Sequence, residues 1–576
     1  MEQTQNNTVT VADFLSDFLE EKKISKVFQL SGGMITQLID SISQKNKIQV
    51  FSLFHEQSCA FAISAIGRIT KKPSVAFATS GPGATNLITG IGDCYFDSIP
   101  AIFITGQVNT FELKGNREIR QLGFQETNIV EMVKPITKMA VQLNEDDDII
   151  SILNELYQAS ISGRPGPVLL DIPMNVQRLK INLTERGAVT KEPKDKVDLK
   201  DVVELISNSK RPLIWAGNGI HLADSENSFR DFVEKTKIPC VLTLHGIDLL
   251  SSKSKMRVGM IGSYGNRWAN KCVAESDLII FLGSRIDIRQ TGANLSLFQD
   301  KKIIRIDNDK SELTNRISHG CLLEMELTDF FIEIDEQLKS IDFDFNNWIE
   351  EIEKLKIAHP IKNETILLES ELGPYELIET ISEKINNRVT YTVDVGSHQM
   401  WAAQSLKFKV GDRFLTSGGM GSMGFSIPAA IGTRVLDNDS DVIVIVGDGS
   451  FQMNIQELQF ISNSKLNIKI LVVNNESLGM IRQFQDSYME GRYFGTKWGY
   501  SVPNICAVSR AYGIESMTLT GKSELESRID WFLSGLGPKL LEFKLRSDLD
   551  VFPKIAFGQT MDKMEPEFIP LGMEST

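Results

Sequence analysis

The sequence has 576 residues, of which 61 are Lys or Arg and 75 are Asp or Glu, so the formal net charge is −14; 42% of the residues are apolar. At roughly 100–200 residues per domain, this length predicts about three or four domains and excludes a single small module. The acidic balance, without any block of Lys and Arg, argues against a nucleic-acid or anionic-membrane surface. Any anionic ligand must therefore be bound by local groups.

Targeting and metal-binding patterns are missing from the sequence. The longest apolar runs, such as Val442–Val446, are too short to span a bilayer, and the first residues, MEQTQNNTVT, are polar. The six cysteines form no CxxC pair, and the six histidines include no adjacent pair and no HExxH. We therefore expect a cytoplasmic protein without a membrane segment, a disulfide framework, a structural zinc or a His-ligated metal.

Three stretches of the chain alternate helix-like segments with short β-rich runs, a pattern typical of parallel α/β sheets. The first extends from Val9 to about Ile181, and residues 183–200 after it form a charged linker candidate. An acidic, helix-forming stretch at 342–371 separates the second from the third, which ends near Phe543. The predicted strands are Val75–Ala78, Ala101–Ile104, Val168–Ile172, Pro212–Ala216, Leu278–Leu282, Ile303–Ile306, Val442–Val446 and Ile468–Val473.

Polar residues follow two of these strands directly. Val442–Val446 runs into Gly447-Asp448-Gly449, and Ile468–Val473 runs into Asn474-Asn475, with an amphipathic segment of helix length between them. Both polar ends would lie at the carboxyl edge of neighbouring parallel strands, where open α/β sheets bind ligands. Glycine lets the backbone approach a phosphate, and carboxylate and amide oxygens suit Mg²⁺. The segment therefore predicts a magnesium and phosphate site.

This segment resembles the signature of the thiamine-diphosphate enzymes, and the resemblance extends over nearly the whole chain. Its closest form looks like the large catalytic subunit of acetohydroxyacid (acetolactate) synthase and related carboligases. The matching pieces are LSGGM at 30–34, HEQSCAFAISAIGR at 55–68, TSGPGATN at 79–86, FQE at 124–126, RPGPVLLDIP at 164–173, GSHQMWAAQ at 396–404 and TSGGMGSMGFSIPAAIG at 416–432.

The resemblance implies three doubly wound parallel-sheet α/β domains. These would be a pyrimidine-binding domain at 1–185, a middle domain at 196–345 and a diphosphate- and Mg-binding domain at 370–545, with a C-terminal tail at 546–576. Because two subunits share each active site in this family, the resemblance implies at least a homodimer. A homotetramer and a regulatory subunit stay open.

Glu56 is the residue that the resemblance makes decisive. The cofactor must lose a proton from the weakly acidic C2 of its thiazolium ring. A carboxyl group bonded to N1′ of the aminopyrimidine favours the imino form, whose N4′ removes that proton. A single carboxyl beside an Ala-rich apolar helix suits this task, whereas most glutamates cap helices or form ion pairs.

Other roles carry over from the family to single positions. Glu56, Gln125 and Gly33 would lie at the reacting carbon, and Asp448, Asn475 and the Ser477 carbonyl would hold Mg²⁺. The remaining cofactor-binding residues implied are Pro82, Asn86, Ser397, His398, Gly421, Met423, Gly449, Ser450, Met453 and Met480. Packed or core roles are the alternative for His398 and Met453.

The middle stretch resembles the FAD-contacting segments of acetohydroxyacid synthases, at 215–219, 259–266, 283–292 and 305–309. The resemblance thus implies FAD as a third cofactor; Gly-x-Gly patterns by themselves do not identify a flavin site. Arg289 matches the arginine that meets the carboxylate of the second oxo acid, and a bidentate donor suits that anion. Phe124 and Phe484 would also face the substrate.

The family resemblance predicts a carboligase that decarboxylates pyruvate and transfers the acetyl unit to a second 2-oxo acid. Decarboxylases of the superfamily place an adjacent His pair near the reacting carbon, and this chain has none. However, Phe484 replaces a tryptophan, Met174-Asn175 replaces a Lys-Asp pair and Met34 replaces a small residue, all on the acceptor side. A keto-sugar nucleotide acceptor therefore stays open, as does a pyruvate oxidase.

Two readings from other classes are weaker. A non-catalytic cofactor-binding subunit would be expected to lack the carboxyl that Glu56 supplies. A plain dinucleotide-binding dehydrogenase would show GxGxxG after the first strand, and this sequence does not.

Overall fold

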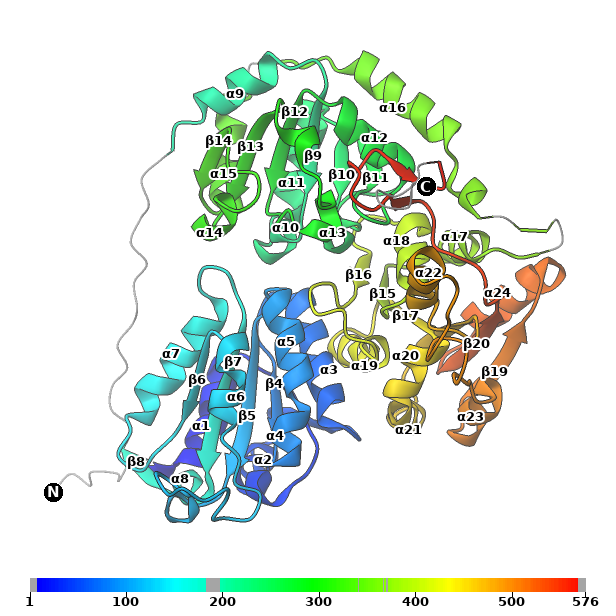
Figure 1. The fold of residues 1–576 in the computed structure, drawn as a ribbon. Helices are drawn as coiled ribbons and strands as arrows, with labels where there is room; N and C mark the ends of the chain where they lie inside the picture. Colours follow the sequence, from blue (N-terminus) through cyan, green and yellow to red (C-terminus); the bar gives the residue numbers. More distant parts are fainter. Residues whose placement is uncertain (1–7, 183–196, 340, 366, 369–370, 568–576) are drawn as a thin grey trace. The chain divides into compact units, whose positions relative to one another are not determined.

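The computed structural model describes residues 8–182, 197–339, 341–365, 367–368 and 371–567. These residues build three six-stranded sheets whose neighbouring strands are all parallel, each lined by helices (Figure 1). The predicted α/β class with three doubly wound parallel sheets is confirmed. Residues 183–196 of the predicted linker lie outside the described residues.

The first sheet has the strand order β3-β2-β4-β5-β7-β6. Its strands are β2 (Lys26–Gln29), β3 (Gln49–Ser52), β4 (Val75–Ala78), β5 (Ala101–Gln107), β6 (Met139–Gln142) and β7 (Pro167–Pro173). The helices around it are α1 (Val11–Glu21), α2 (Thr36–Gln44), α3 (Glu56–Thr70), α4 (Pro82–Asn86), α5 (Ile88–Phe96), α6 (Ile129–Val133), α7 (Ile149–Ile161) and α8 (Met174–Gln177). A small antiparallel pair joins β1 (Thr8–Thr10) to β8 (Lys180–Asn182).

The middle sheet has the order β11-β10-β9-β12-β13-β14. Its strands are β9 (Pro212–Ala216), β10 (Cys240–Leu242), β11 (Arg257–Met260), β12 (Leu278–Leu282), β13 (Lys302–Asp307) and β14 (Cys321–Glu324). Its helices are α9 (Lys200–Ser207), α10 (Gly219–Leu222), α11 (Glu226–Thr236), α12 (Arg267–Glu275), α13 (Ile288–Thr291), α14 (Lys310–Leu313) and α15 (Leu327–Gln337), followed by α16 (Asn346–Ala358) in the predicted acidic stretch.

The third sheet has the order β16-β15-β17-β18-β20-β19. Its strands are β15 (Val389–Val393), β16 (Arg413–Leu415), β17 (Asp441–Gly447), β18 (Ile468–Asn474), β19 (Glu515–Leu519) and β20 (Lys539–Lys544). Its helices are α17 (Pro374–Lys384), α18 (Ser397–Ser405), α19 (Ser426–Leu436), α20 (Asp448–Met453), α21 (Leu458–Asn463), α22 (Gly479–Tyr488), α23 (Ile505–Ala511) and α24 (Leu525–Leu533). The short strands β21 (Lys554–Ile555) and β22 (Met564–Glu565) close the described chain.

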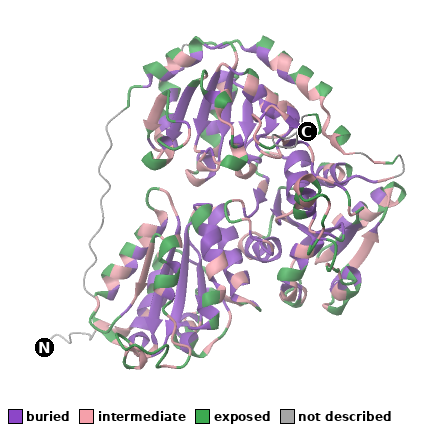
Figure 2. Cartoon of the chain, in the orientation of Figure 1, coloured by how far each residue is buried: buried purple, intermediate pink, exposed green. Residues whose placement is uncertain are grey.

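The central strands are buried along their whole length, as their continuous apolar sequences predicted (Figure 2). The predicted bounds of β4, β9 and β12 match those observed, whereas β5 and β17 extend further into polar residues. The predicted helix after Asp448 is broken into α20 and α21, with Asn454 between them. The Asn454 amide donates to the Gly424 carbonyl oxygen at 2.7 Å, a tertiary contact that replaces continued helix.

In each sheet the strands are added outward in opposite directions from one central pair, β2 and β4, β9 and β12, or β15 and β17; we call that pair the winding reversal. At such a point the connections leave in opposite directions, and a crevice opens at the carboxyl ends of the two strands. These three strand pairs are therefore where each sheet is able to take a ligand.

The described residues of the chain pack into two compact units. The first contains the first sheet together with Ser417–Asn438 and Asn454–Ser464, and the second contains the other two sheets. Within the first unit α19 packs on α3 so closely that a Cβ on Gly432 would lie 2.2 Å from the Ala62 carbonyl oxygen. Among the described helices, none has the length and apolar character needed to cross a membrane.

A buried ionic cluster supports this packing. Arg68 on α3 lies 3.1 Å from the Asp93 carboxylate and 2.8 Å from that of Asp97, and all three side chains are almost fully buried. Burial alone would lower the pKa of the Arg68 guanidinium, but the two carboxylates raise it above its usual value. Asp97 also accepts hydrogen bonds from the amides of Gly418 and Gly419, at 3.0 and 2.7 Å. The cluster thus fixes the 417–424 loop to α5.

We expect the substitution Arg68→Met to destabilise the first unit by about 3–5 kcal/mol, because it leaves two buried carboxylates without their cation. Urea unfolding followed by circular dichroism measures the loss. Lys47→Met is the matched control, since the Lys47–Glu20 ion pair is exposed at the surface. Equal shifts in both variants would contradict the structural role of the cluster.

The buried carboxyl group of Glu457 should make the free energy of unfolding depend on pH. Its carboxylate is fully buried and accepts from the Phe54 amide at 3.1 Å, and burial raises its pKa to about 7 from the usual 4.5. The folded state therefore holds a proton that the unfolded state loses, so this contribution to stability is complete below about pH 4.5 and is lost as the pH rises to about 7. Relative to Glu457→Gln, the wild-type melting temperature should fall as pH rises through this window; a constant difference would contradict the buried proton.

Candidate active site

Glu56 lies where the predicted cofactor base should lie. It is the first residue of α3, only 5% exposed, and its Oε2 accepts a hydrogen bond from the Asn86 amide at 2.9 Å. A Cβ on Gly83 would lie 3.0 Å from Glu56 Oε1, so α4 approaches the other carboxylate oxygen closely. The structure therefore brings the predicted residues Glu56, Pro82 and Asn86 together beside the winding reversal of the first sheet.

The loop after β2 and the loop after β4 touch at this reversal. A Cβ on Gly32 would lie 2.4 Å from the Thr79 Cβ, and the neighbouring Gly33 faces open space, with no atom within 4 Å of a Cβ placed there. Gln125 reaches the same place from a later loop, since a Cβ on Gly81 would lie 3.0 Å from the Gln125 Cβ. Phe124 beside it is 80% exposed. The structure thus groups Gly33 and Gln125 with the Glu56 site.

The 417–424 loop, held by Asp97, carries the predicted Gly421 and Met423. Gly421 has a φ of +66°, and a Cβ there would meet no atom within 4 Å. The Ser422 hydroxyl is buried and has no hydrogen-bond partner among the described residues. This loop therefore leaves space beside Gly421 and carries, at Ser422, a buried hydroxyl without a partner among the described residues.

The predicted diphosphate residues converge at the winding reversal of the third sheet. Ser397 and His398 begin α18 after β15, Gly449 and Ser450 follow β17, and Asn475 follows β18. A Cβ on Gly479 would lie 2.5 Å from Ser397 Oγ and 2.8 Å from Asn475 Nδ2, and Ser450 Oγ donates to the Val395 carbonyl oxygen at 3.1 Å. Three neighbouring strand ends thus bring these polar groups close together.

Asp448, Asn475 and Ser477 fit a hard divalent cation. Asp448 is 2% exposed and burial raises its pKa to about 6, while the nearby backbone amides of Asn475 and Gly449 act in the opposite direction. Asn474 turns away, donating to Glu542 at 2.8 Å, so Asn475 is the amide left for a metal. In the described part of the chain no group of three or more His, Cys, Asp or Glu side chains is arranged to hold a metal ion, and Asp448 is the one carboxylate of the predicted set.

Tyr500 is a member of this site that sequence reasoning missed. Its hydroxyl donates to Asp448 Oδ2 at 2.9 Å, and the segment that carries it is bound to the metal loop through the Leu478 amide and the Thr496 carbonyl oxygen at 3.1 Å. No sequence signal marks this tyrosine, because it lies far along the chain in a loop without a regular pattern.

His398, Met453 and Met480, three of the predicted cofactor-binding residues, differ in burial and in contacts. Burial lowers the pKa of His398 to about 3, and its Nε2 accepts from the Gly447 amide at 3.2 Å, so a neutral imidazole braces the β17 turn. Its contact with a diphosphate stays a prediction. Met453 is 51% exposed, which excludes a core-filling role, whereas Met480 is partly buried against the core.

Two of the predicted substrate residues, Arg289 and Phe484, lie in the second unit on separate helices, whereas Phe124 lies in the first unit. Arg289 in α13 is exposed, and Phe484 in α22 is half-exposed and packs on Tyr488 with ring centroids 4.6 Å apart. The Arg289 carbonyl oxygen accepts from the Ser263 amide at 2.7 Å, and the Ser263 carbonyl accepts from Ile555 at 2.8 Å. The C-terminal segment therefore supports the loop beside Arg289.

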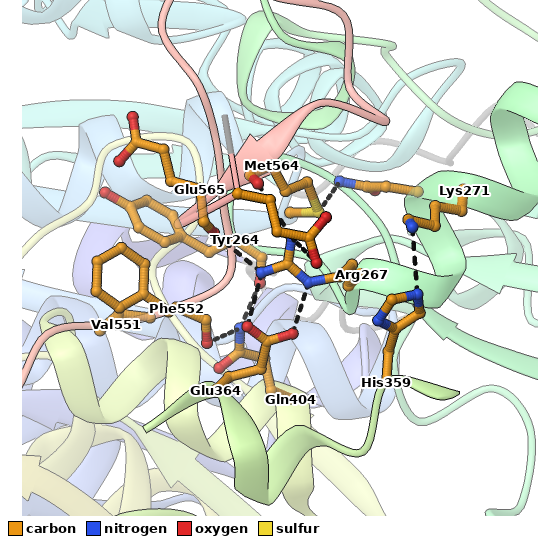
Figure 3. Close-up of polar contacts among 12 residues, drawn as sticks. Tyr264, Arg267, Lys271, His359, Glu364, Gln404, Val551, Phe552, Met564 and Glu565 are labelled. Atoms are coloured by element: carbon orange, nitrogen blue, oxygen red, sulfur yellow. Dashed lines mark hydrogen bonds and ion pairs between the residues drawn. The ribbon is translucent and has the colours of Figure 1, made fainter. Parts of the chain in front are cut away.

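Arg267 holds that C-terminal segment (Figure 3). Its guanidinium, 3% exposed, pairs with both carboxylate oxygens of Glu364 at 2.7 Å and donates to the carbonyl oxygens of Met564 and Glu565 at 3.0 and 3.1 Å. Gln404 adds a link to the Tyr264 carbonyl oxygen at 2.9 Å. The predicted tail is thus an ordered part of the second unit as far as residue 567.

The middle sheet has its winding reversal where the FAD-like segments were predicted. Gly217 follows β9 and Gly283 follows β12, and a Cβ on Gly217 would lie 2.2 Å from the Gly283 carbonyl oxygen. The carboxyl ends of these strands are where such sheets bind dinucleotides. The close approach of the Gly283 backbone is enough to require glycine at position 217, so this glycine is not evidence for a flavin. FAD therefore stays a prediction here.

Comparison with known proteins identifies the family. The chain matches models described as thiamine pyrophosphate enzyme, N-terminal TPP binding domain at residues 9–132, central domain at 199–327 and C-terminal TPP binding domain at 394–543. It is 35% identical over 552 residues to the acetolactate synthase large subunit of Lactococcus lactis subsp. lactis (strain IL1403), covering 95% of this chain and 94% of that protein. The corresponding protein of Cyanidium caldarium is 33% identical, with 98% of both chains covered, and the chloroplastic acetolactate synthase of Arabidopsis thaliana is 34% identical, with 96% and 84% covered. The chain therefore belongs to the thiamine pyrophosphate enzymes, in the group that contains the large subunits of acetolactate synthase.

Proposed function

We propose that this enzyme is a thiamine-diphosphate- and Mg²⁺-dependent carboligase that decarboxylates pyruvate and transfers the acetyl unit to a second 2-oxo acid. The observation that carries the proposal is the buried Glu56 carboxylate, held by Asn86 at the winding reversal of the first sheet. Its relatives are acetolactate synthases over nearly their full length.

Different residues of the chain would bind the metal ion and the diphosphate. Asp448, Asn475 and the Ser477 carbonyl would hold Mg²⁺, and the Ser397 and Ser450 region with Gly449 would take the diphosphate. The Ser477 hydroxyl is buried without a partner among the described residues, so the pocket has a donor to spare for a phosphate oxygen. When bound, thiamine diphosphate supplies an acidic carbon that adds to the oxo acid and accepts the electron pair released with carbon dioxide.

Glu56 would hold a proton on the pyrimidine ring of the cofactor. Asn86 orients its carboxylate, and the wall of apolar side chains on α3 excludes water from it. Gln125 and Gly33 would border the reacting carbon, and Met453, exposed in the second unit, would support the cofactor in its bent form.

On the acceptor side, Arg289 would bind the carboxylate of the second oxo acid with a bidentate pair of hydrogen bonds. Phe484 and Phe124 would line its side-chain space. Labelled pyruvate offered alone, with 2-oxobutyrate, or with a 4-keto sugar nucleotide, followed by mass spectrometry of the products, identifies the acceptor. No release of carbon dioxide from pyruvate, Mg²⁺ and thiamine diphosphate would remove the proposal.

FAD binding and assembly belong to the same proposal. The winding reversal between β9 and β12 would take FAD, and the visible absorbance spectrum of the purified protein tests this. We propose a homodimer or homotetramer that works in the cytoplasm, with a regulatory subunit as a further partner. Sedimentation of the pure chain gives the assembly state.

We expect Glu56→Gln to bind cofactor but to slow proton exchange at its C2 by about 10²–10⁴-fold, because the amide removes the ionisable group. Acid-quenched exchange into deuterated water, followed by NMR, measures the rate. Asp13→Asn changes a carboxyl on α1 that accepts from the Ser41 and Thr10 hydroxyls, and it should exchange at the wild-type rate. Normal exchange in Glu56→Gln would disprove the role of Glu56.

We expect Tyr500→Phe to weaken binding of Mg²⁺ with thiamine diphosphate by about 10-fold, because the Asp448 carboxylate loses the hydroxyl that orients it. Isothermal titration at one neutral pH measures the affinity. Tyr493→Phe is the control, since that hydroxyl bonds Asp486 and not Asp448. Unchanged affinity in Tyr500→Phe would show that the contact has no part in metal binding.

A further inference from the structure

A chain of buried polar side chains runs beneath the Gln125 loop in the first unit. Asp171 on β7 accepts from the Thr105 hydroxyl at 2.6 Å and from the Gln107 amide at 3.0 Å. Gln107 ends β5, and both it and Asp171 are 1% exposed. Neither residue is in direct hydrogen-bond contact with Glu56 or Asn86 among the described residues, and the roles proposed above do not include them.

Asp171 decides how the Gln107 amide points. A carboxylate that accepts from Gln107 Nε2 forces the amide oxygen to the opposite side, where it accepts from the Val108 amide at 3.0 Å and lies 3.0 Å from the Ser80 hydroxyl. The second Nε2 proton goes to the Thr127 carbonyl oxygen at 2.8 Å. Every polar atom of the Gln107 side chain is thus used in one orientation only.

Two neighbours of Gln107, Ser80 and Thr127, hydrogen-bond to the backbone of the loop that carries Gln125. The Ser80 hydroxyl donates to the Gln125 carbonyl oxygen at 2.8 Å, and Thr127, bound to Gln107, directs its own hydroxyl to the same oxygen at 3.2 Å. Gln125 has a φ of +65°, a left-handed conformation that costs a residue with a side chain about 1–2 kcal/mol. Tertiary contacts must therefore hold it.

Burial of the Asp171 carboxyl group is unfavourable for the free energy of folding, so a purely structural role does not explain it. Its carboxylate is fully buried, and no cation pairs with it in the described residues; burial raises its pKa to about 7. An apolar side chain would fill this position between strands at lower cost, as Leu169 and Leu170 do beside it. What Asp171 supplies that an apolar residue cannot is an acceptor for Gln107.

We propose that Asp171 and Gln107 are positioning residues that hold the Gln125 backbone in its left-handed conformation and so aim the Gln125 side chain at the reacting carbon. This inference rests on the proposed function for the role of Gln125. The hydrogen bonds pass from Asp171 through Gln107 to Thr127, and from Thr127 to the Gln125 carbonyl oxygen. The single Ser80 hydroxyl proton goes to that same carbonyl oxygen, so Ser80 holds the loop directly and not through a bond from Gln107. Because Gly81 touches Gln125 and begins the turn into α4, the same network sets Gln125 relative to Glu56.

The first test measures order in the loop and does not depend on activity. Gln107→Leu should increase amide hydrogen exchange in residues 122–128, because the loop loses the hydrogen bond from Gln107 to the Thr127 carbonyl oxygen. Ser80→Ala should do so to a smaller extent, because it removes the bond to the Gln125 carbonyl oxygen. Gln29→Leu is the matched control: Gln29 is also a buried glutamine at a strand end of this sheet, but its bonds go to Ser31 and Ser52. Unchanged exchange at 122–128 in both Gln107→Leu and Ser80→Ala would overturn the proposal.

The second test is a double-mutant cycle on formation of the carbon–carbon product. In the wild-type background, Gln107→Leu should lower kcat by about 10–100-fold with little change in cofactor affinity, as expected for residues that orient a catalytic group. In a Gln125→Ala background the same substitution should change kcat less than about threefold, because the group being aimed is gone. Equal losses in both backgrounds would show that Gln107 acts on stability and not through Gln125.

The two tests separate this inference from the proposed function. If the wild-type enzyme forms no product from pyruvate, the proposed function fails, and hydrogen exchange still decides whether Asp171 and Gln107 hold the loop. Ser80→Ala removes the hydrogen bond to the Gln125 carbonyl oxygen and leaves the bonds of Asp171 intact. It therefore replaces Gln107→Leu in the exchange experiment if that variant does not fold. Asp171→Asn keeps an acceptor for Gln107 and should retain a loop as well ordered as in the wild type; a loosened loop in this variant would count against the orientation argument.

Discussion

The burial of parallel strands on both faces is the constraint on which the rest of the structure depends. Helices cover both sides of each sheet, so side chains along β4, β9, β12, β17 and β18 are almost without exposure and are apolar, apart from Asp441, Lys469 and Asn474. Polar groups are then concentrated where a strand ends. At the winding reversal the connecting loops diverge, and that is where Glu56 with Asn86, and Asp448 with Asn475, are found.

Buried charge serves two different purposes in the first unit. The Arg68 guanidinium lies between two carboxylates, and its loss would leave both uncompensated, so the cluster holds α3, α5 and the 417–424 loop together. Asp171 has only neutral donors, Thr105 and Gln107, and its burial is therefore unfavourable for folding. A charged group kept against its folding cost points to orientation of other groups, here the strained Gln125 loop.

Much of the fold and part of the site could be predicted from the sequence. Apolar runs predicted β4, β9 and β12 to the residue, because a strand buried on both faces needs an uninterrupted apolar sequence. The ends of β17 at Gly447 and of β18 at Asn474 lie where the sequence predicted that polar groups emerge, for the same reason. The break between α20 and α21 could not be predicted, since it depends on the contact of Asn454 with Gly424, a partner distant in sequence.

Tyr500, Arg267 with Glu364, and Asp171 with Gln107 show why the rest of the site could not be derived. Each acts through a partner 52 to 97 residues away, and no local period or motif marks such a pair. The sequence by itself determined the class of fold, the strand ends where polar groups emerge, and the identity of the carboxyl and amide groups there, because these follow from apolar burial and local chemistry. Only the tertiary structure decided which carboxylates are paired, which amides point into the interior, as that of Asn474 does, and which loops are held by buried hydrogen bonds. Those outcomes depend on contacts between elements that are distant in the sequence.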